Sequence, residues 1–367
     1  MSAEVIYLDW NATTPPHPDV LAAMARAGAE AWANPASTHR LGRRARALVE
    51  DTREKIADLC AVHARDVLFT SGGTEANNLA LSHAPGIAVS RLEHPSVTRV
   101  AEELEGRGIP VQWVEVPATG RVEAAAYRAA LERLPRGSVV ALMAANHETG
   151  VLQPLEEVAL AAHEFGALLH VDAVQALGKV APELWRFADS IALAAHKIRG
   201  PKGVGALAFR GRSAPKPVLL GGSQERGLRP GTVDPLAAAG FLAALDRAVG
   251  GPERYRALAS LRDELESELS DCTLINGGDC QRLPHVSNLS FPGRSGDELV
   301  AALDLLGVCV SSGSACSAGT TEPSSIITAM LGRERAKAAV RISLGETTTS
   351  VEIQAVKAAF RSVLAQP

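Results

Sequence analysis

Continuous apolar runs recur through the first two thirds of the chain, and each ends in a polar or glycine-rich cluster. The runs span residues 66–69, 86–90, 138–145, 167–171 and 189–195. Apolar runs of this length are typical of strands that are buried on both faces. Helical patterns separate some of them, at residues 97–108 and 154–166. This alternation predicts βαβ units, and therefore an α/β fold with a parallel sheet covered by helices.

The pattern changes after about residue 245. A long helical stretch at 252–269 leads to short strand-like pieces at 285–291, 308–312 and 339–344, and residues 350–365 have the pattern of an amphipathic helix. These elements indicate a second, smaller α+β domain. We therefore expect a large domain over residues 16–245 and a small domain composed of residues 1–15 and 246–367.

The polar clusters follow the strands, so they are expected at the carboxyl ends of the strands. Open α/β sheets bind ligands in the crevice at that edge. One crevice would collect His94, Asn146, Asp172, Gln175 and Lys197. This convergence carries more weight than any one of these residues taken alone.

Composition narrows the class of protein. The chain has 367 residues, 46% of them hydrophobic and 21% charged, with a net charge of −4. These values argue against disorder and against the basic footprint of a nucleic-acid-binding protein. We find no apolar run long enough for a transmembrane helix and no signal-peptide pattern at the N-terminus. The expected location is the cytoplasm, with no membrane partner and no direct nucleic-acid binding.

The five cysteines are Cys60, Cys272, Cys280, Cys309 and Cys316. No pair has the C-x-x-C spacing of a zinc or redox site, and an odd number in a cytoplasmic protein favours free thiols. Cys60, within a helical pattern, and Cys309, after an apolar run, are expected to be core residues. No metal site is expected.

Three features of the predicted crevice each allow two interpretations. The turn Ser71–Glu75 opens a helix and could hold a phosphate, or it is simply a tight turn. Asp172 could pair with a protonated ring nitrogen or cap a helix. Lys197 stands at the end of a buried strand, where partial desolvation favours Schiff-base chemistry, or it reaches back to the surface. Lys202 suits the surface role.

Ten motifs span nearly the whole chain. These motifs are Tyr7–Pro15, Asn34–Ser37, Ser71–Glu75, Glu93–His94, Asn146–Gly150, His170–Gln175, His196–Gly203, Gln224–Thr232, Ser311–Cys316 and Arg341–Gly345. In these motifs and in their order, the sequence resembles the cysteine desulfurases, which belong to the class V aminotransferase group of fold-type I enzymes dependent on pyridoxal 5′-phosphate (PLP). The resemblance implies a mostly parallel, seven-stranded sheet between helices.

The resemblance also implies a role for each matching residue. Lys197 would form the Schiff base with PLP and later move the substrate's α-proton, and His94 would stack on the ring and act as an acid or base. The other implied cofactor contacts are Asp172 at the ring nitrogen, Gln175 and Asn146 near the phenolic oxygen, and Gly73, Thr74 and His196 at the phosphate. Thr232 would reach the phosphate of the neighbouring subunit, which implies a homodimer. Arg341, helped by Asn11, would bind the substrate carboxylate.

Cys316 separates a desulfurase from other members of this group. It lies in a run of small and polar residues, which is typical of an exposed loop. The resemblance makes its thiolate the nucleophile that takes the sulfur of L-cysteine as a persulfide, releases L-alanine and passes the sulfur to an acceptor. Iron–sulfur assembly, tRNA thiolation, nucleic-acid sulfur modification and cofactor synthesis remain open as destinations.

The main departure from the family pattern is Ala194, where a serine or threonine that donates to the phosphate is usual. Arg199 is a possible substitute donor. Three alternatives are a selenocysteine lyase, an aminotransferase and a non-catalytic scaffold. Cys316 argues against an aminotransferase, and the complete set of Lys197, Asp172, His94 and Cys316 argues against a scaffold.

Overall fold

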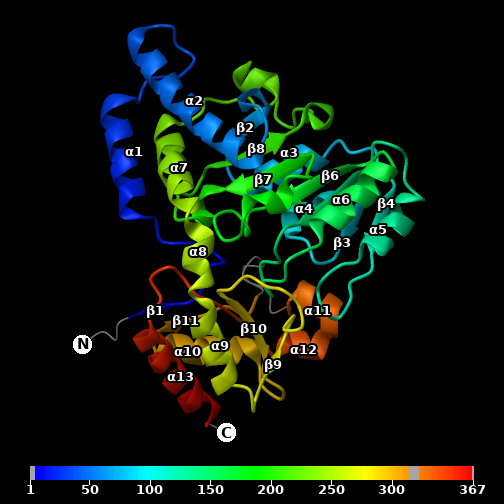
Figure 1. The fold of residues 1–367 in the computed structure, drawn as a ribbon, viewed down its shortest axis with the longest axis vertical. Helices are drawn as coiled ribbons and strands as arrows, with labels where there is room; N and C mark the ends of the chain where they lie inside the picture. The colour runs from blue at the N-terminus through cyan, green and yellow to red at the C-terminus, as the bar shows by residue number, and fades with distance from the viewer. Residues whose placement is uncertain (1–4, 314–321, 366–367) are drawn as a thin grey trace.

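The chain has a broad α/β part and a smaller part that holds both ends of the chain (Figure 1). This description rests on a computed structural model that covers residues 5–313 and 322–365. The larger part, at the top of Figure 1, is a sheet between layers of helices, and the smaller part lies below it. Cys316 lies outside the described residues.

A seven-stranded sheet forms the centre of the larger part. Its strands are β2 (Val67–Thr70), β3 (Ile87–Ser90), β4 (Val111–Val114), β5 (Val139–Met143), β6 (Leu168–Asp172), β7 (Ser190–Ala194) and β8 (Gly205–Phe209). Their order is β2-β8-β7-β6-β5-β3-β4, and β8 runs antiparallel to β2 and β7 while the other pairs are parallel. The expectation of a mostly parallel sheet is confirmed, and every expected apolar run contains a strand.

Helices cover both faces of this sheet. On one face lie α2 (Arg40–Cys60), α5 (Ala124–Leu131), α6 (Leu155–Glu164) and α7 (Pro235–Ala248), and on the other lie α3 (Gly73–Leu81) and α4 (Pro95–Gly106). Helix α1 (Pro18–Glu30) packs against α7. Single 3-10 turns are η1 (Ala64–Asp66), η2 (Pro182–Trp185), η3 (Ala195–Lys197), η4 (Gly211–Ser213) and η5 (Gln224–Gly227).

The continuous apolar strands are explained by this double cover. In β5, Val140 and Leu142 pack into the cluster that contains α5 and α6, while Val139 and Ala141 pack into the cluster that contains α4. Successive side chains of a strand point to opposite faces. A strand with helices on both sides therefore needs apolar residues at every position.

The smaller part combines two short sheets with helices. Strand β1 (Ile6–Tyr7) pairs in parallel with β11 (Val308–Cys309), and β12 (Ala339–Ser343), β10 (Val286–Ser290) and β9 (Leu274–Ile275) form an antiparallel sheet. Its helices are α9 (Ala259–Glu268), α10 (Gly296–Leu305), α11 (Ser325–Leu331), α12 (Arg333–Lys337) and α13 (Ser350–Leu364). Phe291 stacks on Phe360 at 5.6 Å within a separate apolar cluster.

The helical stretch expected at 252–269 is two helices, α8 (Gly251–Arg256) and α9. Between them, the amide of Leu258 donates to the carbonyl of Tyr255, three residues back, so the chain tightens for one turn. Both residues are buried in the same apolar cluster. Hydrophobic periodicity alone does not show such a break.

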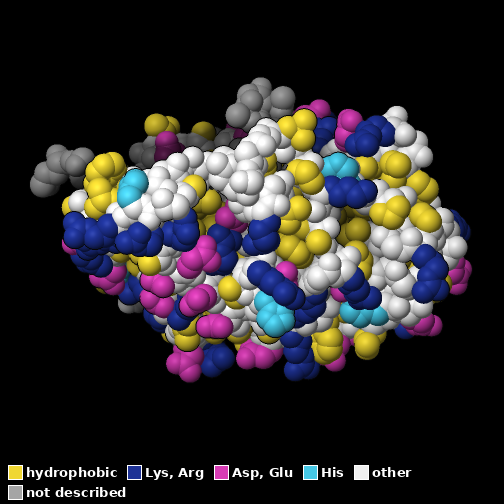
Figure 2. Space-filling view, turned by 90° about the horizontal axis from the view of Figure 1, so that it is seen from above, with side chains coloured by type: hydrophobic (Ala, Val, Ile, Leu, Met, Phe, Trp, Pro, Cys, Tyr) yellow, Lys and Arg dark blue, Asp and Glu magenta, His cyan; other side chains and the backbone are white. Residues whose placement is uncertain are grey.

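Charged side chains of both signs are mixed on the surface. On the face shown in Figure 2, lysine and arginine side chains lie beside aspartate and glutamate side chains and apolar atoms. Exposed side chains also form ion pairs, such as Arg44 with Glu30 and Arg91 with Glu102. Within the described residues, no helix is both long and apolar enough to cross a membrane.

Candidate active site

A cavity of about 310 Å³ opens at the carboxyl edge of the large sheet. Residues that follow β2, β3, β5, β6 and β7 line it, together with the N-terminal segment and residues of the smaller part. Of the residues expected at the site, the lining includes Asn11, Gly73, Thr74, His94, Asp172, Gln175, His196, Lys197 and Arg341. Four of the five residues that the sequence was expected to bring together, His94, Asp172, Gln175 and Lys197, line this one cavity.

Lys197 sits on the short turn η3, which directly follows β7. Its Nζ donates to the main-chain carbonyls of Asn11, at 2.5 Å, and Ala12, at 2.8 Å. The Thr14 hydroxyl donates to the carbonyl of His196 at 2.8 Å, which ties the turn to the same N-terminal segment. The lysine amine is thus held inside the cavity, and it does not reach the surface.

Asp172 is the last residue of β6, and both its oxygens accept hydrogen bonds. One oxygen accepts from the amide of Val174 at 3.0 Å, and the other accepts from Asn77 Nδ2 at 2.8 Å. The carbonyl oxygen of Asn77 faces Nε2 of His170 at 2.9 Å. The carboxylate is therefore fixed in orientation by two neutral donors, one a main-chain amide and the other a side-chain amide.

His94 caps the start of α4 with its imidazole. Its Nδ1 accepts from the amide of Ser96 at 3.1 Å, so in the neutral ring the proton is on Nε2. Burial lowers the pKa of His94, and the Lys197 charge adds to this effect although Asp172 opposes it. The ring of His147 meets His94 edge-on at 5.4 Å. His94 therefore presents a neutral ring to the cavity.

The first turn of α3 forms the wall beside β2. Amide groups at a helix start have no partner within the helix and attract anions. A Cβ on Gly73 would lie 2.6 Å from Val174, so glycine is needed for this close approach. His196 lies nearby in the lining, and its Nδ1 is 3.0 Å from the Thr13 hydroxyl. Burial lowers the pKa of His196 to about 4, so this ring is neutral at pH 7.

Arg341 belongs to β12 of the smaller part and lines the cavity from there. Its side chain is buried, with one nitrogen 2.6 Å from Asp9 and another 3.2 Å from the carbonyl of His147. Its Nε is buried and has no hydrogen-bond partner among the described residues. A buried donor without a partner is costly, which indicates a place for an anionic ligand.

Among the described residues, two expected site residues, Asn146 and Thr232, do not line the cavity. Asn146 is buried beside it, where its carbonyl oxygen accepts from the amides of Glu148 and Thr149. Thr232 is exposed and lines a separate depression near Asn34 and Glu225. Cys316 lies outside the described residues, so the structure gives no position for it.

Ala194 does line the cavity, as the departure from the family pattern implies. The suggested replacement by Arg199 is wrong in this structure, because Arg199 does not line the cavity. Its Nε donates to the carbonyl of Pro15, and its guanidinium faces Glu346 at 3.7 Å. The sequence could not show this, because the backbone of Arg199 has a positive φ of 65° that turns the chain away.

Sequence reasoning missed several residues of the site. Asn77 links Asp172 to Ser96, and Ser96 in turn contacts His94, so one amide joins two of the expected residues. His147 lies in the Asn146–Gly150 motif, but the family resemblance assigns it no role. Asn77 stands four residues after Gly73, one helical turn further along α3, and that spacing was the available signal.

These residues fit PLP. A cofactor with a phosphate, a ring nitrogen and an aldehyde needs an anion site, a carboxylate and an amine around one cavity. The α3 start, Asp172 and Lys197 provide them, and 310 Å³ is at the lower end of the range for small-molecule sites. The fit lacks a hydroxyl donor at Ala194, where the family pattern has one for the phosphate. Arg341 Nε, which has no hydrogen-bond partner among the described residues, is available to a substrate carboxylate.

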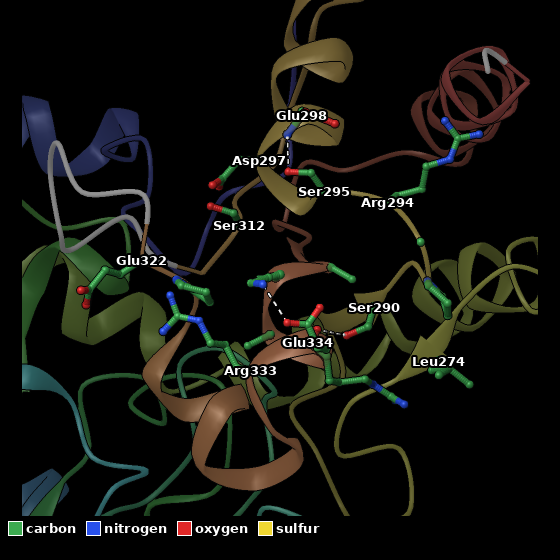
Figure 3. A pocket seen from close by; sticks show the side chains of 17 residues that line it. Leu274, Ser290, Arg294, Ser295, Asp297, Glu298, Ser312, Glu322, Arg333 and Glu334 are labelled. Atoms are coloured by element: carbon green, nitrogen blue, oxygen red, sulfur yellow. Dashed lines mark hydrogen bonds and ion pairs between the residues drawn. The ribbon is translucent and has the colours of Figure 1, made fainter.

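A larger cavity of about 870 Å³ lies in the smaller part. In Figure 3, Ser295 and Asp297 border it at the start of α10, and Arg333 and Glu334 border it at α12. It collects charges of both signs, but its described lining includes none of the residues at the carboxyl ends of the strands of the large sheet. It is therefore the weaker candidate for chemistry despite its size.

The chain matches the family model described as Aminotransferase class-V over residues 6–356. It is 41% identical to a protein named cysteine desulfurase from Cereibacter sphaeroides, over 95% of this chain and 93% of that protein.

Solved structures agree with this match. A NifS-like protein from Rickettsia africae superposes with a TM-score of 0.90 at 30% identity, covering 98% of this chain and 99% of that chain. A structure described as SspA in complex with cysteine gives a TM-score of 0.81 at 28% identity, over 94% of this chain and all of that chain. The fold and the family match therefore extend over nearly the whole length.

Proposed function

Because the chain belongs to the aminotransferase class V family, we propose that it is a PLP-dependent cysteine desulfurase, which converts L-cysteine to L-alanine and passes on the sulfur. One observation carries the proposal. A single cavity brings together the amine of Lys197, the carboxylate of Asp172 and the guanidinium of Arg341, in a chain whose relatives are named cysteine desulfurases.

PLP bound in this cavity would supply an electrophilic carbon that captures an amine and a ring that stores negative charge. Asp172 would hold the proton on the ring nitrogen, and the α3 start with Thr74 and His196 would hold the phosphate. His94 would lie against the ring. Lys197 Nζ, held between two carbonyls, would remove the proton from the substrate's α-carbon.

The substrate carboxylate would bind Arg341, whose Nε lacks a partner among the described residues. Asn11 borders this place, but its side chain already donates to the carbonyl of His147 and faces His285 at 3.0 Å. Asn11 would therefore shape the site mainly through its main-chain carbonyl. With its carboxylate held by Arg341, the substrate would turn its α-proton toward Lys197, and this orientation would speed proton removal.

Cys316 would take the sulfur. Its thiolate attacks the sulfur of the bound L-cysteine, an S–S bond forms, and the C–S bond breaks with its electron pair moving to carbon. A proton then adds to that carbon, which gives L-alanine. The sulfur remains as a persulfide on Cys316 until an acceptor protein or a small thiol removes it. This part rests on the motif around Cys316.

We also propose a homodimer, with Thr232 reaching the neighbouring subunit's site. Thr232 is exposed on the segment after η5, and exposed apolar residues lie close to it in the sequence, including Leu220, which is 92% exposed. Light scattering would measure the mass in solution. A monomeric protein with full activity would contradict the role of Thr232.

The division into residues 16–245 and residues 1–15 with 246–367 remains part of the proposal. So does a cytoplasmic location, where a reducing environment keeps a nucleophilic thiol available. The nature of the acceptor, including an iron–sulfur scaffold or a thiolation enzyme, belongs to the same proposal. Pull-down with persulfidated protein would identify it.

Two substitutions test the reaction. Lys197→Ala should abolish the yellow colour and the formation of alanine from cysteine, because no other lysine among the described residues lines the cavity. Cys316→Ser should keep PLP binding but lower sulfur release by at least about a hundredfold, since the nucleophile is lost. Absorption spectra and an alanine assay measure both effects. Normal alanine release by Lys197→Ala would contradict the assignment.

Comparison of cysteine with selenocysteine as substrate separates the nearest alternative. A desulfurase should depend on Cys316 with cysteine. A lyase specific for selenocysteine would release alanine from selenocysteine alone, and it would do so in the Cys316→Ser variant as well.

A further inference from the structure

Lys179 is the more deeply buried of the two buried lysines among the described residues, and it does not line the cavity. It is 2% exposed and lies in the turn that follows β6. Its Nζ donates to Oε1 of Gln175 at 2.9 Å and lies 5.9 Å from the centre of the Tyr255 ring. The other well-buried lysine, Lys357, contacts two carboxylates, Glu264 and Glu268.

Lys179 thus has an unusual environment for a buried lysine. The groups that act on its charge are cationic, since Lys197 and Arg341 both disfavour the ammonium form. Burial, reinforced by these two charges, lowers the pKa of Lys179 to about 7. Such a group costs stability, so a position used only for packing would favour an apolar residue.

The hydrogen bonds of Gln175 show what this lysine can do. An ammonium group only donates, so Oε1 of Gln175 must face Lys179. A carbonyl only accepts, so Nε2 of Gln175 must face the main-chain oxygen of Asn11, which it does at 2.9 Å. Both ends agree, which fixes the orientation of the amide. The second N–H of Nε2 is left for the cavity, which Gln175 lines.

We propose that Lys179 is a positioning residue, which fixes the Gln175 amide so that it offers an N–H donor to an anionic oxygen of the ligand in the cavity. The same carbonyl of Asn11 also accepts from Lys197, so the contacts run from Lys179 through Gln175 to the reactive lysine. The inference rests on the proposed function, because the anionic oxygen is that of bound PLP.

The test is a double-mutant cycle with Lys179→Met and Gln175→Ala. Apoprotein is titrated with PLP to measure affinity, and the visible absorption of the loaded protein is followed against pH. Lys179→Met should weaken PLP binding about tenfold and move the spectral midpoint to higher pH by about one unit, because an anionic oxygen loses its donor. In the Gln175→Ala background, Lys179→Met should add no further change.

A third measurement separates positioning from structure. The apoprotein of Lys179→Met should unfold in urea at the same or a higher midpoint than the parent at pH 7, since it no longer buries an amine beside Lys197, Arg341, His196 and His285. Lys337→Met is the matched control. Lys337 is exposed and pairs with Glu334, so its loss should change none of the three measurements.

Several results would overturn the inference. They are an unchanged PLP affinity, an effect that persists in full without Gln175, or a clearly destabilised apoprotein. A persistent effect would assign Lys179 a through-space charge effect, and a destabilised apoprotein would assign it a packing role. A parent protein that binds no PLP would refute the proposed function itself, and the inference would fall with it.

Discussion

Ala194 places a methyl group in the cavity wall, where the family pattern has a hydroxyl. We expect Ala194→Ser to tighten PLP binding by about ten- to a hundredfold, because a hydrogen bond to a charged group contributes roughly 1.5–3 kcal/mol. The Ala194 methyl lies 3.8 Å from where a Cβ on Gly73 would stand, so it borders the start of α3, where the phosphate would bind. Equilibrium titration of apoprotein with PLP measures the change.

Ala195→Ser is the matched control. Ala195 is fully buried one residue further along and does not line the cavity, so a hydroxyl there should not improve affinity. Equal gains from both substitutions would show that Ala194 has no special relation to the phosphate.

For single residues, the sequence predicted the charged and reactive side chains of the site. It did not predict the side chains that position them through hydrogen bonds. Lys197 and Asp172 could be recognised because a polar residue at a buried strand end is unusual. Asn77 and Lys179 could not, because their roles depend on side-chain hydrogen bonds between segments far apart in the chain. Arg199 was misjudged because its direction depends on backbone geometry.

Among the elements, the turn η5 is held by a buried ion pair. Glu225 accepts two hydrogen bonds from Arg53 on α2, at 2.7 and 2.8 Å, and one from the amide of Phe69. Glu225 and Arg226 both have positive φ, a conformation that costs about 1–3 kcal/mol for each such residue. The pair stabilises this strained turn, which leads to Thr232.

We expect Glu225→Ala to lower the free energy of unfolding by about 3–5 kcal/mol, because it leaves Arg53 buried without its main partner. Urea unfolding at pH 7 measures the loss. The chain offers a matched control in Glu50, which also pairs with Arg53 but is 46% exposed. Glu50→Ala should cost less than about 1 kcal/mol. Similar losses for both variants would contradict the importance of the buried pair.

Prediction of the elements succeeded where burial is complete. The strands β5 and β7 are buried at every position, and apart from Ser190 at the start of β7 their residues are all apolar. Strand β4 is half-buried at three of its four positions, and its sequence, VQWV, gives no comparable run. The break between α8 and α9 was missed because both helices continue the same apolar face.

For the whole molecule, buried histidines should determine the response to acid. Burial lowers the pKa of His147, His170 and His285, so each binds fewer protons when folded than when unfolded below about pH 6.5. The free energy of unfolding is therefore not reduced by these histidines above about pH 6.5, and it decreases as the pH falls, because protons bind the unfolded chain more readily. Glu93 and Glu148 act in the opposite direction, because burial raises their pKa values.

Burial also lowers the pKa values of His17, His94 and His196, so six histidines outnumber two carboxyls and the apoprotein should lose stability from pH 6.5 to pH 5. Each uncompensated proton contributes about 1.4 kcal/mol per pH unit. Urea midpoints at pH 5, 6, 7 and 8 measure this. Glu148→Gln should steepen the loss, because the pKa of Glu148, about 7, opposes it in the parent. A urea midpoint that stays constant from pH 5 to pH 8 would contradict the prediction that the histidines outweigh the two carboxyls.

The N-terminal segment has a consequence for how the protein matures in the cell. Asn11 and Ala12 leave the ribosome well before Lys197, yet their carbonyls hold Lys197, and the amide of Asn11 donates to Ser343, 332 residues further along. A nascent chain can fold its large sheet before synthesis ends. The surroundings of Lys197 are complete only after β12 has emerged, so we expect the protein to capture its cofactor after β12 has been synthesised.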